Sequence, residues 1–301
     1  MIQYIKDFFA WLFGTSPATI QEAEEDFGLE DASDLPDQYT ETDLVPEAAT
    51  RSVGTRDLGI PATGPIIVIE EGDDGGLAKI NSPKFVWCLD NGHGSLQAGK
   101  RWPDPDDGSQ LLEWKFNRAI VREIIQQIDD QDLGIQYFNV VPEDNVGSYL
   151  KERVSIANTH DHPLGLPKIY VSIHGNAAGS TSASGIETWY HLNSAAGKRI
   201  ASVFQKYLMN ELGTDGTHIW KDRGIRTFSP AGKNFYVLRT TNMPAVLTEN
   251  GFYTNDEERA RMNTPEIQKK IATAHLKAML EIEQNGFDNA TIYHKNRQIS
   301  V

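Results

Sequence analysis

The stretch FVWCLDNGHG, residues 85–94, decides the fold: an apolar run leads directly into a polar, glycine-rich turn that carries His93. A short uninterrupted apolar run of this kind is typical of a strand buried on both faces of a parallel sheet. Two later stretches share the design, since residues 169–173 lead into His174 and residues 245–248 lead into Glu249. Ligands and catalytic groups gather outside the carboxyl ends of such strands, so we expect the three turns to meet in one cleft.

Helix and strand signals alternate around these three runs. Further strands are expected at residues 135–141, 186–191 and 235–238. Helices are expected at residues 112–128, 149–158, 195–212 and 265–282. This alternation predicts an α/β domain with an open, twisted, mostly parallel sheet covered by helices on both faces.

The acidity of the chain belongs to one segment. The 301 residues carry a formal net charge of −14, and residues 15–78 hold 16 acidic side chains against two arginines. Elsewhere acids and bases cancel, and no basic patch supports nucleic-acid binding. The segment is also poor in periodic apolar residues, so we expect a largely irregular acidic arm.

We therefore expect four regions. Residues 1–14 form a short amphipathic helix, which packs on its own domain or a partner, anchors to a membrane surface or particle, or is a signal peptide. Residues 15–82 form the acidic arm with one strand at 65–69, residues 83–286 the catalytic domain, and residues 287–301 a polar tail. A single cysteine, Cys88, excludes an intramolecular disulfide. No apolar run is long enough for a transmembrane helix.

The polar turns carry the residue types of a catalytic zinc site. Such a site takes three protein ligands, often His and Glu, and leaves one position for water. His93 and His174 are two candidates, and Glu113, which opens the helix after the first turn, is a third. Glu249 suits the separate task of general acid/base.

Each of these residues also has a plainer interpretation. Either histidine could be a loop residue that hydrogen-bonds to the backbone. Glu113 could be a first-turn residue that interacts favourably with the helix dipole, and Glu249 could cap a turn. Asn176 could orient the site or substrate, or stabilise a turn. Arg239 could bind a stem-peptide carboxylate or form a structural ion pair.

The order of motifs from residue 84 to residue 284 resembles the zinc-dependent N-acetylmuramoyl-L-alanine amidases, the cell-wall enzymes of division, sporulation and phage lysis. The matching stretches are residues 89–94, 112–117, 152–158, 172–177, 185–188, 237–239 and 243–252, with Asn255. The resemblance implies that His93, Glu113 and His174 bind one Zn²⁺ and that Glu249 is the catalytic acid/base. It also implies peptidoglycan as the substrate, with water attacking the lactyl carbonyl bonded to L-alanine.

Two departures lie in the first turn, where Asn91 and Ser95 replace the proline and glycine usual in the family. Division-type members carry a long inhibitory helix after the second histidine motif, but only residues 178–184 stand at that place. We therefore expect an active site that is open without an activator.

The biological setting is a separate expectation. We expect the chain to act at the bacterial wall or periplasm, as an autolysin or as a lysin delivered by holin-like release or on a phage tail or injection particle. The N-terminal helix and acidic arm are candidates for docking to that assembly or to a membrane surface. Rival interpretations are a zinc peptidase or deacetylase on a similar fold, and a non-catalytic wall-binding component.

Overall fold

The computed structural model describes residues 77–97, 99–213, 218–229 and 234–294. The predicted helix at residues 1–14, the strand at 65–69 and most of the acidic arm lie outside the described residues, as do residues 295–301. The described part of the arm contributes Ile80, and the predicted tail contributes Phe287, to the buried core. The region boundaries stay predictions.

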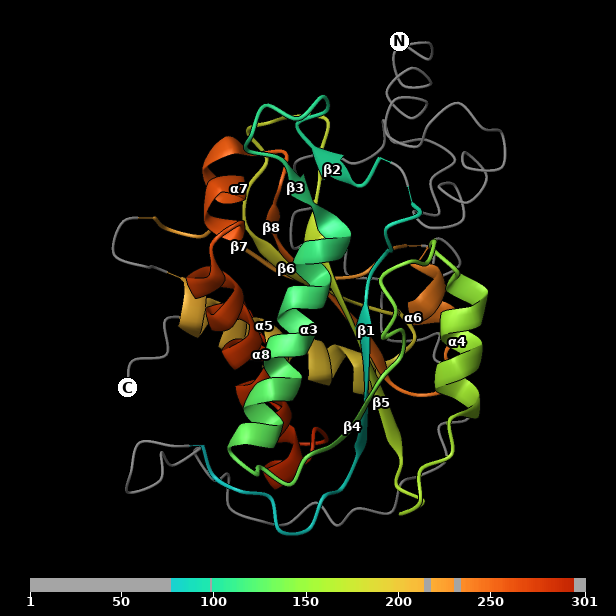
Figure 1. Ribbon diagram of the computed structural model, residues 1–301. Coiled ribbons are helices and arrows are strands. Elements are labelled where there is room, and N and C mark those ends of the chain that lie inside the picture. The colour runs from blue at the N-terminus through green and yellow to red at the C-terminus, as the bar shows by residue number, and fades with distance from the viewer. Residues whose placement is uncertain (1–76, 98, 214–217, 230–233, 295–301) are drawn as a thin grey trace.

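A six-stranded mixed sheet forms the centre of the molecule (Figure 1), with the strand order β4-β1-β5-β8-β6-β7. The strands are β1 Val86–Asn91, β4 Gln136–Asn139, β5 Lys168–Asn176, β6 Ile186–Tyr190, β7 Asp222–Arg226 and β8 Ala245–Phe252. All neighbouring pairs are parallel except β6 and β8. The predicted open, mostly parallel α/β sheet is confirmed.

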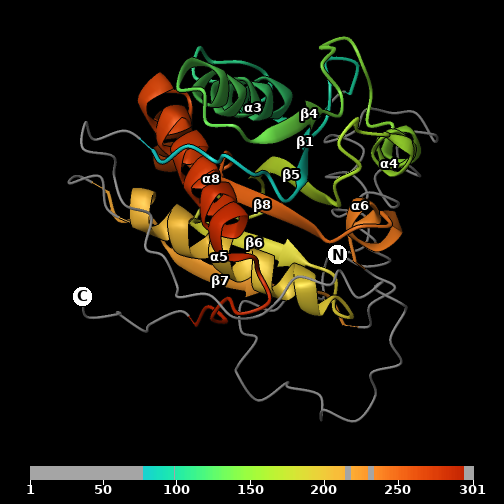
Figure 2. The ribbon, with the colours of Figure 1, turned by 90° about the horizontal axis from the view of Figure 1, so that it is seen from below.

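Helices cover both faces of this sheet unequally (Figure 2). The long helices α3 Glu113–Asp130, α5 Ala195–Leu212 and α8 Pro265–Asn285 cover one face. The short helices α4 Leu150–Thr159 and α6 Tyr236–Thr240 cover part of the other. A further helix, α7 Asp256–Met262, follows β8, and a small hairpin pairs β2 Arg101–Trp102 with β3 Leu111–Leu112.

Strand alternation divides the sheet side chains between two hydrophobic clusters. In β5, Ile169, Val171 and Ile173 pack in the larger cluster with the long helices. Tyr170 points the other way, into the smaller cluster beneath α4 and α6. His174 has the same parity as Tyr170, so its side chain projects from the face that α4 and α6 cover. Because those two helices are short, this is the thinly covered face of the sheet.

One predicted strand is wrong. Residues 235–238 were expected to be extended, but they enter α6, which runs from Tyr236 to Thr240. Val237 and Leu238 are buried in the smaller cluster. A short apolar run is compatible with either a strand or one turn of helix, and here packing against the sheet face decides.

Candidate metal centre and active site

The structure brings together the three predicted metal ligands. One donor atom each from His93, Glu113 and His174 lies within 4.8 Å of the others. Glu113 Oε1 lies 3.3 Å from His93 Nε2 and 3.1 Å from His174 Nδ1. These donors come from the turn after β1, the first residue of α3 and the carboxyl end of β5.

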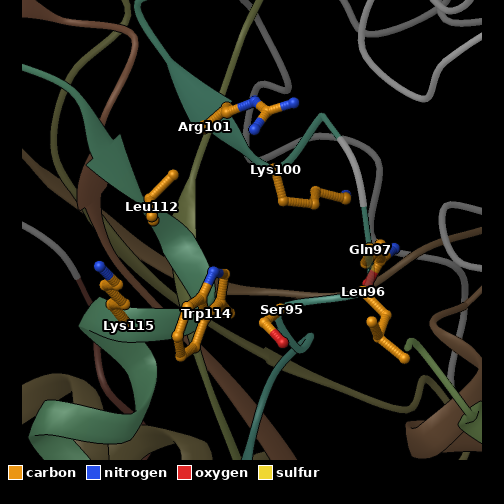
Figure 3. Close-up of a pocket in the computed structure, with 8 residues that line it drawn as sticks. All are labelled: Ser95, Leu96, Gln97, Lys100, Arg101, Leu112, Trp114 and Lys115. Carbon is orange, nitrogen blue, oxygen red and sulfur yellow. The ribbon is translucent and has the colours of Figure 1, made fainter. Parts of the chain in front are cut away.

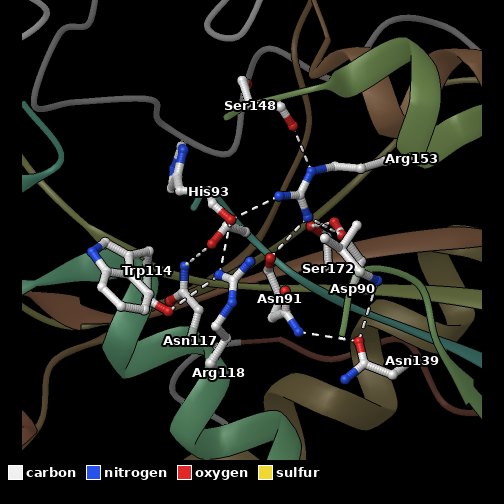
Figure 4. Close-up of polar contacts among 12 residues, drawn as sticks. Asp90, Asn91, His93, Trp114, Asn117, Arg118, Asn139, Ser148, Arg153 and Ser172 are labelled. Carbon is white, nitrogen blue, oxygen red and sulfur yellow. Dashed lines mark hydrogen bonds and ion pairs between the residues drawn. The ribbon is translucent and has the colours of Figure 1, made fainter. Parts of the chain in front are cut away.

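Two arginines fix the backbone of the first turn (Figure 4). His93 has a positive φ of 63°. Its carbonyl oxygen accepts hydrogen bonds from Arg118 Nη1 at 2.8 Å and from Arg153 Nη2 at 2.7 Å. Asn117 donates to the carbonyl of the preceding Gly92 at 3.0 Å. These bonds offset the cost of a conformation that is uncommon for a residue with a side chain.

A buried carboxylate anchors one of those arginines. Asp90 Oδ1 lies 2.5 Å from Arg153 Nη1, and Asp90 Oδ2 accepts a hydrogen bond from Ser172 Oγ at 2.7 Å. Burial alone would raise the pKa of Asp90, but the Arg153 charge and the Ser172 hydroxyl hold it below its ordinary value. Asp90 is therefore an anion that ties β1, β5 and α4 together beneath the metal centre.

Hydrogen bonds to the outer nitrogen of each imidazole fix which nitrogen faces the centre. His93 Nδ1 lies 2.6 Å from Gln97 Oε1, and His174 Nε2 lies 3.1 Å from Ser172 Oγ. If each outer nitrogen carries the proton, His93 Nε2 and His174 Nδ1 present lone pairs toward Glu113. This is the usual arrangement of metal-binding histidines, which donate their second N–H to a neighbouring oxygen.

The His174 ring fits against a bare backbone. A Cβ atom placed on Gly92 would lie 2.1 Å from His174 Cε1, far inside van der Waals contact. Glycine is therefore required at this position by the close approach of the ring, and not by an unusual φ.

The electrostatics favour a neutral imidazole beside an anionic carboxylate. Burial lowers the pKa of His93 below its ordinary value, although Glu113 opposes the change. Burial would raise the pKa of Glu113, but the two imidazoles hold it well below its usual range. Both side chains therefore have the protonation state that a metal ligand needs.

Glu249 lies beside the metal centre in the sheet. It is the register partner of His174 across the β5–β8 pair and of Glu187 across the β8–β6 pair. Register partners project from the same face of a sheet, so the Glu249 carboxylate lies on the thinly covered face with His174. It is 8% exposed. Burial first, and then the negative charges of Glu113 and Glu249, raise the pKa of Tyr253 well above its ordinary value.

Beyond Glu249, the same face continues with a charged cluster. Buried Glu187 lies 2.5 Å from Arg223 Nε and accepts a hydrogen bond from the Trp189 indole at 2.9 Å. Asn176 donates to Glu187 Oε1 at 3.2 Å, and its own Oδ1 accepts from the Ala177 amide at 2.8 Å. The contact with the Ala177 amide lies in the turn and the contact with Glu187 lies on the face of Glu249, and both interpretations offered for Asn176 stay predictions.

Arg239 has a different setting. It is exposed on α6, and its guanidinium lies 5.0 Å from the centroid of the Tyr236 ring. The role proposed for it from sequence, recognition of a stem-peptide carboxylate, stays a prediction.

Sequence reasoning gave no role to several residues that build the centre, among them Asp90, Gln97, Arg153, Ser172 and Glu187. A signal for two of them was present, because Asp90 and Ser172 are polar residues inside or directly after runs that are otherwise apolar. No sequence pattern of this kind predicts the contact of Gln97 with His93. It depends on how the turn folds back on His93.

The loop between β5 and β6 is short. Residues 178–184 form only turns and bends, and no helix lies between Asn176 and Ile186. The Gly185 amide at its end donates to Glu258 Oε1 at 2.7 Å, which ties the loop to α7. Among the described residues, no helix is long and apolar enough to cross a membrane.

The three-donor cluster fits a zinc ion. Tetrahedral zinc with bonds of about 2.0–2.1 Å keeps neighbouring ligand atoms about 3.3 Å apart. The separations of 3.3 and 3.1 Å from Glu113 to the two imidazoles match that spacing. Two nitrogen donors and one carboxylate also form a set that zinc commonly takes in catalytic sites.

The chain is similar to several known proteins. It is 31% identical over 189 residues to N-acetylmuramoyl-L-alanine amidase LytC of Bacillus subtilis, covering 62% of this chain but only 33% of that protein. It is 29% identical over 200 residues to the endolysin of Bacillus phage SPP1, covering 66% of each. The catalytic domain of the amidase CwlV from Bacillus (Paenibacillus) polymyxa var. colistinus superposes with a TM-score of 0.53 at 29% identity, covering 65% of this chain and 97% of that domain.

The sequence also matches the family described as N-acetylmuramoyl-L-alanine amidase over residues 88–281, which is more than half of the chain. The matched region begins within β1 and ends within α8, so it contains most of β1, the other five strands of the main sheet and all three metal-ligand candidates. The chain belongs to the N-acetylmuramoyl-L-alanine amidase family.

Proposed function

We propose that this protein hydrolyses the amide bond between N-acetylmuramic acid and L-alanine in peptidoglycan, using one zinc ion held by His93, Glu113 and His174. The observation that carries the proposal is the convergence of these three donors within 4.8 Å, together with the carboxylate of Glu249 on the neighbouring strand. Family membership supplies the bond type.

Each residue near the metal centre has a separate role in this proposal. A zinc ion in such a site acts as a Lewis acid, which acidifies water and polarises a carbonyl oxygen. Glu113 and the two imidazoles would hold the ion, and Gln97 and Ser172 orient the imidazoles. Glu249 then accepts the proton of the attacking water and delivers it to the departing L-alanine nitrogen. Residues 178–184 contain no helix that would have to move before substrate enters.

Digestion of purified peptidoglycan tests the proposal. Wild-type protein should release L-alanine amino groups while leaving the glycan strands uncut, as measured by amino-group labelling and mass spectrometry of the fragments. EDTA treatment should abolish this release, and added Zn²⁺ should restore it. Free peptide termini from within the stem, or released acetate, would instead support a peptidase or a deacetylase. Tight wall binding without any product would support the non-catalytic reading.

We further propose that the protein reaches the wall as an autolysin or as a lysin delivered by release or on a particle, with residues 1–76 as the docking segment. The similarity to both LytC and a phage endolysin is compatible with either route. Removal of residues 1–76 spares Ile80, which is buried in the core. Unchanged localisation and assembly of that truncated chain would rule out docking.

A further inference from the structure

Cations flank the metal centre on two sides. Between the turn after His93 and the start of α3, three basic residues line a pocket of about 400 Å³ (Figure 3): Lys100, Arg101 and Lys115. None of the three metal ligands is among the residues that line it. Toward the opposite edge of the sheet, Arg223 and Arg226 of β7 approach the face that carries Glu249, because both pair with Glu187 on that face.

Two buried carboxylates lie directly opposite each other on the β6–β8 pair. Glu187 is the register partner of Glu249, and the two residues are 4% and 8% exposed. Register partners of an antiparallel pair have Cβ atoms about 4.5–5.5 Å apart, and like charges at this spacing are unfavourable. The arrangement therefore needs positive charge close to at least one of the two carboxylates.

Glu187 receives that positive charge from β7. Its Oε2 lies 2.5 Å from Arg223 Nε and 3.5 Å from Arg226 Nε. Its Oε1 accepts hydrogen bonds from the Trp189 indole at 2.9 Å and from Asn176 Nδ2 at 3.2 Å. Two guanidiniums on one oxygen and two neutral donors on the other hold the Glu187 side chain in one orientation.

The Arg223 side chain reaches past β6 to the strand that carries Glu249. Its guanidinium carbon lies 4.9 Å from the centroid of the Phe252 ring, and Phe252 is the last residue of β8, three residues after Glu249. The buried carboxylate of Glu258 is engaged by the Gly185 and Phe252 amides, each at 2.7 Å. If Arg223 lost its present partner on β6, Glu249 would be the next carboxylate in the same row of the sheet.

We propose that Glu187 is a positioning residue that holds the guanidiniums of Arg223 and Arg226 away from Glu249. The proposal rests on the proposed amidase function, in which Glu249 takes and returns a proton. Arginine binds carboxylates through two parallel hydrogen bonds, so a guanidinium on Glu249 would occupy both of its oxygens. A carboxylate occupied in this way cannot accept the proton of the attacking water. Glu187 prevents this by pairing with both arginines itself.

Substitutions of the two partners have unequal effects under this proposal, whereas a structural ion pair needs both of its partners. Glu187→Gln keeps the size of the side chain and an oxygen that accepts from Trp189 and Asn176, but it releases the guanidiniums. We expect kcat on a soluble N-acetylmuramoyl-L-alanine peptide to fall at least about tenfold, the lower range for a hydrogen bond to a charged group, with KM nearly unchanged. Arg223→Gln should keep kcat within about threefold of wild type, and Glu187→Gln/Arg223→Gln should recover most of the lost kcat.

Glu281→Gln is the matched control. Glu281 also pairs with a cation, Lys206, but this pair joins α8 to α5 on the opposite face of the sheet. The control should have the kcat and KM of wild type. Each variant is checked by circular dichroism for its fold and by plasma mass spectrometry for one equivalent of zinc.

Equal losses of kcat in Glu187→Gln and Arg223→Gln, or no recovery in the double variant, would overturn the role of Glu187 alone. A raised KM in Arg223→Gln would also overturn it, because Arg223 would then contact the substrate. If Glu187→Gln does not fold, Arg223→Gln and the double variant decide: near-wild-type kcat in both supports the proposal, and a loss in either overturns it. Wild-type protein that cleaves neither this peptide nor peptidoglycan would overturn the proposed function and this proposal together.

Discussion

At the scale of single residues, the metal centre depends on side chains that do not touch the ion site themselves. Ser172 is fully buried, accepts the outer N–H of His174 and donates to Asp90. It therefore fixes both the ring orientation and the nitrogen that faces Glu113. Partners of this kind tune metal affinity without supplying a ligand.

We expect Ser172→Ala to weaken zinc affinity by about 10–100-fold, the range typical when such a partner is lost. Competition with a chromogenic chelator measures the affinity directly. Ser202→Ala is the control, because Ser202 is equally buried but bonds the Lys198 carbonyl within α5. Equal zinc affinity in the two variants would refute the orienting role of Ser172.

Gly92 gives a steric prediction. Gly92→Ala should displace the His174 ring, because the new Cβ would lie 2.1 Å from Cε1, and zinc should be lost on gel filtration. Gly179→Ala, where a Cβ meets no heavy atom within 4 Å, should retain a full equivalent of zinc. Metal content by plasma mass spectrometry compares the two, and full zinc occupancy in Gly92→Ala would contradict the packing described here.

Glu249 gives a catalytic prediction. Glu249→Gln keeps the shape of the side chain but cannot relay a proton, so kcat should fall by about 10²–10⁴-fold while zinc stays bound. His93→Ala should lose zinc as well as activity. Zinc content and turnover on the same preparations separate the two effects, and near-normal turnover by Glu249→Gln would assign the proton transfers to another group.

At the scale of elements, β8 links the active site to the core through its two faces. Glu249 points to the thinly covered face, whereas Thr248 points to α8, where its Oγ1 lies 2.9 Å from His275 Nε2. His275 Nδ1 bonds the Ile271 carbonyl at 2.7 Å. Asn250 Nδ2 in turn lies 3.1 Å from Thr248 Oγ1 and 2.9 Å from the His174 carbonyl oxygen, so the α8–β8 contact extends to β5.

This contact makes stability depend on pH. Burial lowers the pKa of His275 from 6.5 to about 4. The unfolded state therefore binds more protons between these values, and stability falls as the pH drops from about 7 toward 4. The loss attributable to His275 is about 2 kcal/mol by pH 5. Urea unfolding in EDTA measures the free energy of unfolding at pH 7.5 and 5.0. The decrease in this free energy between the two pH values should be smaller for His275→Gln than for wild type. An identical decrease would mean that His275 does not contribute.

At the scale of the whole molecule, the site lies where the sheet is least covered. Within the described part of the chain, three long helices bury one face and only α4 and α6 cover the other, where His174, Glu249 and Glu187 lie in register. With only seven residues between the second histidine motif and Gly185, the described loop holds no inhibitory helix. An extended polymer such as a glycan strand with its stem peptides can approach such a surface from solvent.

We therefore expect purified full-length protein to digest peptidoglycan without an added activator, measured as release of soluble muropeptides. Because residues 178–184 hold no helix that would have to be displaced, adding extract from the host should change the rate little. Protein that is fully folded and zinc-loaded but inactive until a partner is supplied would contradict this expectation.

The sequence by itself determined the α/β class, most elements and the identity of the ligand candidates. These features are local: an apolar run followed by a polar turn is visible in ten residues, as at 85–94. The strand predicted from the same kind of local pattern at residues 235–238 was wrong, because packing on the sheet made this segment the helix α6.

Only the tertiary structure decided how the candidates are oriented and what surrounds them. Gln97 and Ser172 select the imidazole nitrogens, Arg118 and Arg153 fix the His93 turn, and Lys100 comes to lie beside Glu113. Each contact depends on where distant or looped-back segments meet. Apolar periodicity predicts which face of a strand is buried, but it carries no information on which polar atoms will find each other at the edge of a sheet.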